Sequence, residues 1–234
     1  MRKIGTRSSS ESHYRCGAND VVLITGGMGP ANASEKAKAA FGLGFEKMAG
    51  RKPDLALAIG LCGGLNTSLA EGDIVAYSAC LSTDDDKTSL SCSNSITNSV
   101  TALLQGSGIR CECVVGITSS RIATKRSERL ALAERGAAVV DMESHSILQA
   151  AAAVKIPAAI LRVVSDSIDR QLPDFNRALN DRGGLDGRKA LKVALGSPWS
   201  TAKLLAANKR AMQRLTGALE IVLKAGCFPL SASD

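Results

Sequence analysis

Apolar residues in this 234-residue chain gather in short runs, separated by stretches in which they recur on successive helical turns. A short apolar run bounded by turn residues is typical of a buried strand, and a helical repeat is typical of a helix with one buried face. The apolar runs predict strands at residues 20–25, 53–60, 72–81, 110–120, 137–143 and 157–166. The helical repeats predict helices at residues 31–50, 96–108, 124–136 and 144–155, and two more that are divided near residues 196–199.

The order of these elements predicts a single α/β domain. Strands that alternate with helices favour a largely parallel sheet covered by helices on both faces. No linker or internal repeat divides the chain, so one domain is expected over residues 20–228, preceded by a polar and flexible segment at residues 1–19. Residues 167–187, which contain a proline and a glycine pair, are expected to be irregular.

The composition is ordinary for a folded protein, except that aromatic side chains are few. Hydrophobic residues make up 45%, charged residues 22% and aromatic residues only 3% of the chain. A surface that stacks nucleic-acid bases on aromatic rings is therefore not expected. The formal net charge is +7, but the Lys and Arg residues alternate with apolar residues at helical spacing, as in residues 203–214. We interpret them as a solvated helix face or as an attraction for an anionic substrate, and we expect no nucleic-acid partner.

The cysteines and the hydropathy favour a cytoplasmic protein without a membrane span. The chain has seven cysteines, an odd number, and no CxxC pair, so neither a disulfide framework nor a zinc site is expected. Reduced thiols fit a reducing compartment. The best candidate for a span, residues 147–161, is interrupted by Lys155 and Pro157. We expect no metal and no bound cofactor.

Small and acidic residues follow several of the predicted strands. They form the segments GGMGP (26–30), GLCGG (60–64), VVDMES (139–144) and VVSDSID (163–169). Because ligands of α/β sheets bind at the carboxyl ends of strands, this clustering indicates a site. The glycine segment at 26–30 lacks the spacing of a dinucleotide fingerprint and of a P-loop, and a tight turn explains it equally well.

Each acidic strand end also has a purely structural interpretation. Asp141 and Glu143 stand where a strand gives way to a helix, and an acidic residue there commonly caps the helix. Asp166, at the end of the strand 157–166, could act as a general acid or could cap a turn. Arg162 and His145 are interpreted as structural partners.

Taken together and in this order, the segments GGMGPANA, GLCGGLNTSLAEGDIVAYS, VVDMES and LRVVSD resemble the nucleoside phosphorylase and nucleosidase family. That family includes purine nucleoside phosphorylase, uridine phosphorylase and methylthioadenosine/S-adenosylhomocysteine nucleosidase. The resemblance spans about residues 21–166. Within the family, MESHSILQAAA and RVVSD are most similar to the hopanoid-associated phosphorylases, which are assigned as adenosylhopane nucleosidases. The resemblance implies one three-layer α/β/α domain around a mixed, partly barrel-like sheet, assembled as a homo-oligomer.

The resemblance also implies roles for individual residues. Glu143 would accept hydrogen bonds from the ribose hydroxyls, and Met142 would pack beneath the sugar. Asp166, assisted by Ser165, would donate a proton to the departing purine. Gly27 would lie near the ribose and the nucleophile. The segment 118–123, with Ser120 and Ile122, would line the base pocket largely through backbone atoms.

These roles agree with the chemistry of N-glycosidic cleavage. The transition state places positive charge on the sugar and negative charge on the departing base. A carboxylate held against the ribose stabilises the positive charge, and a proton donor neutralises the negative charge.

Three positions depart from the family pattern. Residues 1–19 have no equivalent of the family's first strand and acidic turn, which supplies the residue that activates water in nucleosidases, so we expect the chain to begin after that strand. Leu61 replaces a hydroxyl residue that contacts phosphate or the nucleophile, which favours hydrolysis over phosphorolysis. Ile122 replaces an aromatic residue of the base pocket.

The leading hypothesis is therefore an enzyme that cleaves a purine nucleoside or an adenosyl compound, with water as the nucleophile. The alternatives are a phosphate-dependent nucleoside phosphorylase and a catalytically inactive protein that only binds nucleosides.

Overall fold

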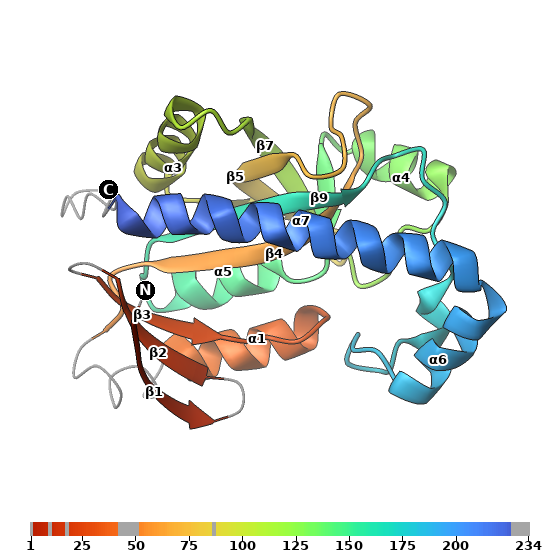
Figure 1. The fold of residues 1–234 in the computed structure, drawn as a ribbon, viewed down its shortest axis with the longest axis horizontal. Coiled ribbons are helices and arrows are strands. Elements are labelled where there is room, and N and C mark those ends of the chain that lie inside the picture. The colour runs from red at the N-terminus through yellow and green to blue at the C-terminus, as the bar shows by residue number, and fades with distance from the viewer. Residues whose placement is uncertain (1, 9–10, 17–18, 42–51, 86–87, 226–234) are drawn as a thin grey trace.

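The computed structural model describes residues 2–8, 11–16, 19–41, 52–85 and 88–225 (Figure 1). The strands are β1 (Arg2–Ser8), β2 (Glu11–Cys16), β3 (Asn19–Ile24), β4 (Ala56–Gly64), β5 (Ile74–Ser82), β6 (Leu90–Ser91), β7 (Cys111–Thr118), β8 (Val139–Asp141) and β9 (Ala158–Asp166). The helices are α1 (Pro30–Ala39), α3 (Asn94–Gly106), α4 (Arg126–Ala133), α5 (Ser144–Ala153), α6 (Gly187–Gly196) and α7 (Pro198–Lys224), with a 3₁₀ turn, η2, at Phe175–Ala178.

A six-stranded mixed sheet with the order β6-β5-β7-β8-β4-β9 forms the centre of the fold. The β4–β9, β5–β7 and β7–β8 pairs are parallel, whereas the β5–β6, β4–β8 and β5–β9 pairs are antiparallel. Because β5 pairs with both β7 and β9, five of the strands close into a ring. The mixed, partly barrel-like sheet that the resemblance implies is confirmed, and its two longest pairings, β4–β9 and β5–β7, are parallel, as element order predicts.

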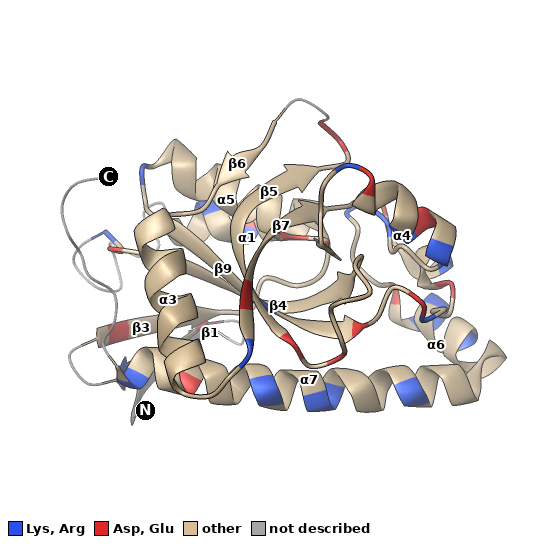
Figure 2. Cartoon of the chain, turned by 90° about the horizontal axis from the view of Figure 1, so that it is seen from above, with Lys and Arg blue, Asp and Glu red and all other residues tan. Residues whose placement is uncertain are grey.

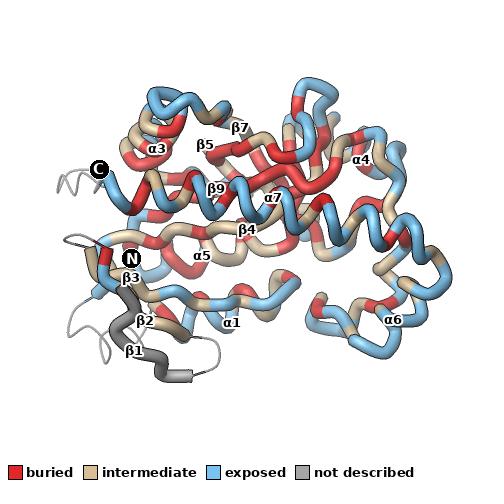
Figure 3. The backbone as a smooth tube through the Cα atoms, in the orientation of Figure 1, coloured by how far each residue is buried: buried red, intermediate tan, exposed pale blue. Residues whose placement is uncertain are grey.

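Helices cover the sheet on both faces, as expected for three layers (Figures 1 and 3). Successive residues of β9 point to opposite sides of the sheet. Ile160 and Val164 pack in the core that contains Leu148 of α5, while Leu161 packs in the core that contains Leu215 of α7. All nine residues of β9 are buried, which explains why the strand reads as an apolar run from Ala158 to Val164 that only Arg162 interrupts.

The N-terminal part of the chain differs from the prediction. Residues 20–25 were expected to form a buried strand, but β3 is the third strand of a separate antiparallel sheet with the order β1-β2-β3, and its Leu23 is 42% exposed. The residues of β2 are too polar to predict a strand from periodicity, yet backbone pairing needs no particular side chain. Of the described residues before β4, none pairs with the six-stranded sheet.

The remaining elements match the sequence analysis closely. The predicted strand runs from residue 53 onward correspond to β4, β5, β7, β8 and β9, and the short strand β6 lies in a segment that was expected to be a polar loop. The helix predicted at 31–50 is present as α1, and residues 42–50 lie outside the described residues. Within the described ranges, no helix is both long and apolar enough to cross a bilayer.

Candidate active site

Three strand ends converge at Gly63 of β4. Gly63 pairs with Val140 of β8 on one side and with Asp166 of β9 on the other. A Cβ atom at this position would lie 3.2 Å from Asp166 Oδ2 and 3.3 Å from Val140 Cγ1, so glycine allows the close approach. The convergence brings the acidic segment after β8 and the acidic end of β9 to the same edge of the sheet, as the strand-end rule predicts.

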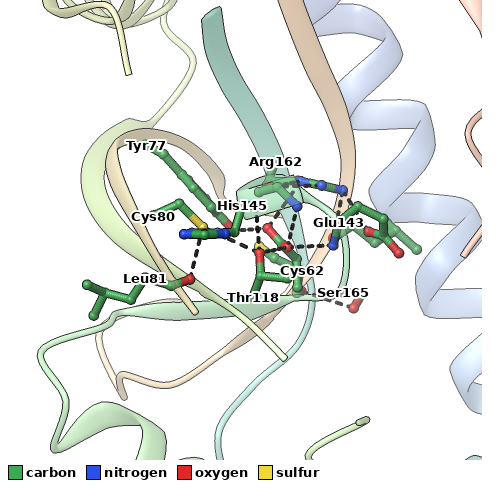
Figure 4. Close-up of polar contacts among 12 residues, drawn as sticks. Cys62, Tyr77, Cys80, Leu81, Thr118, Glu143, His145, Arg162 and Ser165 are labelled. Carbon is green, nitrogen blue, oxygen red and sulfur yellow. Dashed lines mark hydrogen bonds and ion pairs between the residues drawn. The ribbon is translucent and has the colours of Figure 1, made fainter. Parts of the chain in front are cut away.

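Asp141, the last residue of β8, organises this edge through bonds that include Tyr77 and Thr118, both labelled in Figure 4. Its carboxylate is buried and accepts hydrogen bonds from Tyr77 Oη at 2.9 Å, from Thr118 Oγ1 at 2.8 Å, and from the backbone N–H groups of Glu143 and Ser144 at 3.0 and 2.9 Å. Burial raises the pKa of Asp141, but the Arg162 guanidinium and these hydrogen bonds outweigh burial and hold the pKa below its usual value. Its interpretation as local structure agrees with this geometry.

Arg162 of β9 is buried and forms ion pairs with the carboxylates of Asp141 and Glu143. Its Nη2 and Nε donate to Ser144 Oγ at 2.8 and 3.2 Å, and ion pairs of 3.5 Å reach Asp141 Oδ2 and Glu143 Oε2. Burial disfavours the charge, but the two carboxylates outweigh burial and raise the pKa of Arg162. A Cβ at Gly60 would lie 2.3 Å from Arg162 Nη1, so the absence of a side chain at Gly60 leaves room for the guanidinium.

Glu143 is the least enclosed carboxylate of this group, with a side chain that is 19% exposed. Its Oε1 accepts a hydrogen bond of 3.1 Å from the backbone N–H of Gly29, in the glycine turn before α1. Burial raises the pKa of Glu143 above its usual value, and the negative charge of Asp141 adds to the rise, although Arg162 and Gly29 oppose it. Glu143 is therefore a partly open carboxylate held by a cation on one side and a glycine turn on the other.

Asp166 forms a second buried ion pair, with Arg129 of α4. The Arg129 Nη2 group donates to Asp166 Oδ2, and the exposed fractions of the two residues are only 1% and 4%. The same guanidinium donates to the carbonyl oxygens of Ser167 at 2.5 Å and Ala123 at 3.0 Å. Ser165 Oγ lies 2.5 Å from the other carboxylate oxygen, Asp166 Oδ1. Both oxygens of Asp166 are thus engaged within the protein.

The other residues expected at the site occupy distinct surroundings. Met142, which lies between Asp141 and Glu143 in the sequence, is buried. Ser120 Oγ donates to Asp84 at 3.3 Å, and the N–H and C=O groups of Ile122 bond to the side-chain amide of Asn176 at 2.8 and 2.9 Å. In the glycine turn, Gly29 rather than Gly27 contacts Glu143.

Sequence reasoning interpreted Arg162 as a structural partner and did not single out Arg129 or Asn176. Arg129 belongs to an amphipathic helix with three charged residues, so nothing in the pattern marks it as the one that is buried. Arg162 interrupts an otherwise apolar strand, which is a usable signal, because a buried charge requires partners. Asn176 lies in the segment that was expected to be irregular, where periodicity offers no guidance.

The buried cysteines Cys62, Cys80, Cys92 and Cys111 are not activated nucleophiles. Cys16, Cys62, Cys80, Cys92, Cys111 and Cys113 are free thiols. Burial raises the pKa of Cys92 to about 12 and that of Cys111 to about 11, and burial likewise raises the pKa of Cys62, which lies near Asp166. A thiol attacks as its thiolate, so these residues serve packing. Within the described part of the chain, no three His, Cys, Asp or Glu side chains are grouped as metal ligands.

Comparison with known proteins assigns a family model and a set of similar structures. The model of the phosphorylase superfamily matches residues 5–185. No curated protein matches the chain. Futalosine hydrolase of Helicobacter pylori superposes with a TM-score of 0.71 at 13% identity, covering 94% of this chain and 87% of that one. The methylthioadenosine/S-adenosylhomocysteine nucleosidase of Neisseria meningitidis, bound to methylthio-immucillin-A, superposes with a TM-score of 0.71 at 16% identity, covering 96% and 89%.

Proposed function

This chain belongs to the phosphorylase superfamily, and we propose that it cleaves the N-glycosidic bond of a purine nucleoside or adenosyl compound. The observation that carries the proposal is the convergence at Gly63, which brings the partly exposed Glu143 and the buried Asp166 to one edge of the sheet. Similar structures include a futalosine hydrolase and adenosyl nucleosidases, and these names support the reaction class.

Glu143 anchors the sugar in this proposal. Its carboxylate accepts hydrogen bonds from ribose hydroxyls, and its negative charge stabilises the positive charge that develops on the ribose. Arg162 and the Gly29 N–H hold the carboxylate before substrate arrives, so little reorganisation is needed when the bond breaks. Met142 packs beneath the ribose.

Asp166 delivers a proton to the departing base. In this proposal Asp166 passes the proton of its carboxyl group to a purine ring nitrogen as the glycosidic bond breaks. Water adds its hydroxyl to the ribose and releases the proton that restores Asp166, while Arg129 remains bound to Ser167 and Ala123. Ser165 orients the carboxyl group through Oδ1. Ser120, Ile122 and the glycine turn with Gly27 complete the pocket around base and sugar.

Water is the proposed nucleophile, because Leu61 offers no hydroxyl where phosphate would be held. The proposed substrate is an adenosyl compound, and adenosylhopane is the specific candidate that the sequence resemblance favours. The free thiols support action in the cytoplasm, and the family resemblance supports a homo-oligomer.

The test compares adenosine, methylthioadenosine and adenosylhopane, with and without phosphate, by the release of free adenine. Release without phosphate supports hydrolysis, and release only with phosphate supports a phosphorylase. In the active reaction, Glu143→Gln should impair both binding and turnover. Asp166→Asn should reduce turnover of adenosine about 100-fold or more, yet affect a nitrophenyl riboside much less, because that leaving group needs no proton. Equal losses on both substrates would remove Asp166 from the acid role. Nucleoside binding without release would support the inactive alternative.

A further inference from the structure

The excess of positive over negative charge in this protein lies in α6 and α7. Residues 187–219 contain seven Lys and Arg residues and no Asp or Glu. The whole chain has 29 Lys and Arg against 22 Asp and Glu, so removing this segment leaves 22 against 22. The formal net charge of +7 therefore belongs to a single helical pair at one side of the fold (Figure 2). Within the described part of the chain, none of these seven cations forms an ion pair.

The same helices expose large apolar side chains. The exposed fractions are 60% for Leu191 and 70% for Leu195 in α6, and 82% for Trp199 and 63% for Leu205 in α7. Helix α6 buries none of its residues, although its apolar and polar positions are strongly segregated. Exposed apolar side chains gathered in one region, in contrast to scattered ones, mark an interaction surface.

Apolar and basic positions alternate in stripes on these helices. Residues three, four or seven apart share one side of a helix, so Trp199, Ala202 and Ala206 form a small apolar stripe on the exposed side of α7. Lys203 and Lys209 lie on either side of that stripe. In α6, Leu191 and Leu195 are one turn apart, beside Arg188 and Lys192. We call the exposed side chains of α6 and of residues 198–210 the basic–apolar face.

We propose that the basic–apolar face docks on an anionic lipid bilayer surface. Helices that carry Trp and Leu beside Lys and Arg bind in the plane of the interface, where the apolar side chains enter the acyl boundary and the cations meet anionic headgroups. Trp in particular favours the headgroup level. This would be peripheral binding, because no described helix can span the bilayer.

Two other occupants fit the face less well. A second copy docked through the same face would bring six cations against six, with no acidic residue in residues 187–210 to offset them. Nucleic acid would satisfy the cations but would leave Leu191, Leu195 and Leu205 without an apolar partner. Arg210 and Arg214 lie close to Glu71 in a shallow cleft, so the experiments use the α6 end of the face.

Trp199 is the only tryptophan in the chain, so its fluorescence reports directly on this face. The protein is titrated with phosphatidylcholine vesicles that contain or lack phosphatidylglycerol. We expect a blue shift of the emission and protection from acrylamide only with the anionic vesicles, with reversal at high salt. An absent shift at low salt, or vesicle flotation without any change in emission, would overturn the proposal.

A matched pair of charge variants tests the position of the contact. Lys192→Glu/Lys203→Glu should weaken vesicle partitioning about 25-fold or more, because each cation at the surface contributes about fivefold. Lys36→Glu/Lys38→Glu, on the exposed side of α1, changes the net charge equally and should retain most of the binding. Equal losses in the two variants would show that net charge acts without this face.

Two controls address the other occupants. An emission shift that appears on raising the protein concentration without lipid would show that a second copy covers the face, which would overturn the proposal. Duplex DNA that binds more tightly than anionic vesicles at the same salt concentration would do the same. Circular dichroism and the unfolding midpoint of each variant confirm that the fold is retained.

Discussion

The buried pair of Arg129 and Asp166 leads to a prediction that can be worked out from the geometry. Arg129→Met removes a guanidinium that serves three acceptors: Asp166 Oδ2, the Ser167 carbonyl and the Ala123 carbonyl. It leaves a carboxylate that is only 4% exposed without its cation. Breaking such a buried pair on one side costs about 3–5 kcal/mol, a large part of the 5–15 kcal/mol that holds a typical domain together.

A double-mutant cycle separates the pair from the individual side chains. Asp166→Asn alone leaves an unpaired guanidinium and should also be destabilising. The double variant Arg129→Met/Asp166→Asn buries neither charge and should be more stable than the sum of the single losses predicts, by about 3 kcal/mol. Urea unfolding gives the free energies, and each kcal/mol corresponds to about 2–4 °C in Tm for a chain of this size. Losses that add within about 0.5 kcal/mol in the cycle would show that the two side chains are not coupled.

Other predictions concern the edge around Glu143. Because the pKa of Glu143 is raised in the fold, ionising it costs stability, so Glu143→Gln should gain stability relative to the parent as the pH rises from about 4 to 7, as followed by urea unfolding. Asp141→Asn should lower the free energy of unfolding by about 3–5 kcal/mol at neutral pH. Because the pKa of Asp141 is depressed in the fold, the difference in stability between variant and parent should narrow as the pH falls below about 3.9. A difference that does not change with pH would contradict the charge-based explanation. Gly29→Ala should impair nucleoside binding more than Gly27→Ala. Both residues have positive φ, but only a Cβ at position 29 would lie 2.6 Å from the Gly183 backbone. Equal affinities of the two variants in isothermal titration calorimetry would contradict this prediction.

The sequence predicts the central strands because strands that are buried on both faces consist of runs of apolar residues. Strand β9 is buried over all nine residues, and its run from Ala158 to Val164 is broken only by Arg162. The register and direction of pairing leave no such mark, which is why the antiparallel β5–β9 and β4–β8 pairs were not foreseen from periodicity. Strand β2 is polar and pairs through its backbone, so hydropathy could not predict it.

The candidate site was predictable as far as its acidic residues, and not as far as their partners. Glu143 and Asp166 follow apolar runs, and strand ends gather ligands, so position alone marks them. The cations that hold them come from α4 and from within β9, and only three-dimensional packing decides which Arg is buried. The sequence marks a carboxylate at a strand end, whereas the protonation state of that carboxylate depends on contacts far away in the chain.

The segment between β9 and α6 connects the site to the basic–apolar face. Asn176 in η2 holds both backbone polar groups of Ile122, while Gly183 lies against the glycine turn that contacts Glu143. A few residues later, the Asp186 side chain caps α6 by accepting from the backbone N–H groups of residues 188 and 189. A membrane contact through α6 would therefore bear directly on a segment that contacts both Ile122 and the glycine turn. A nucleoside with an apolar group at its 5′ end would partition into the same interface, which brings the two proposals to one substrate class without either depending on the other.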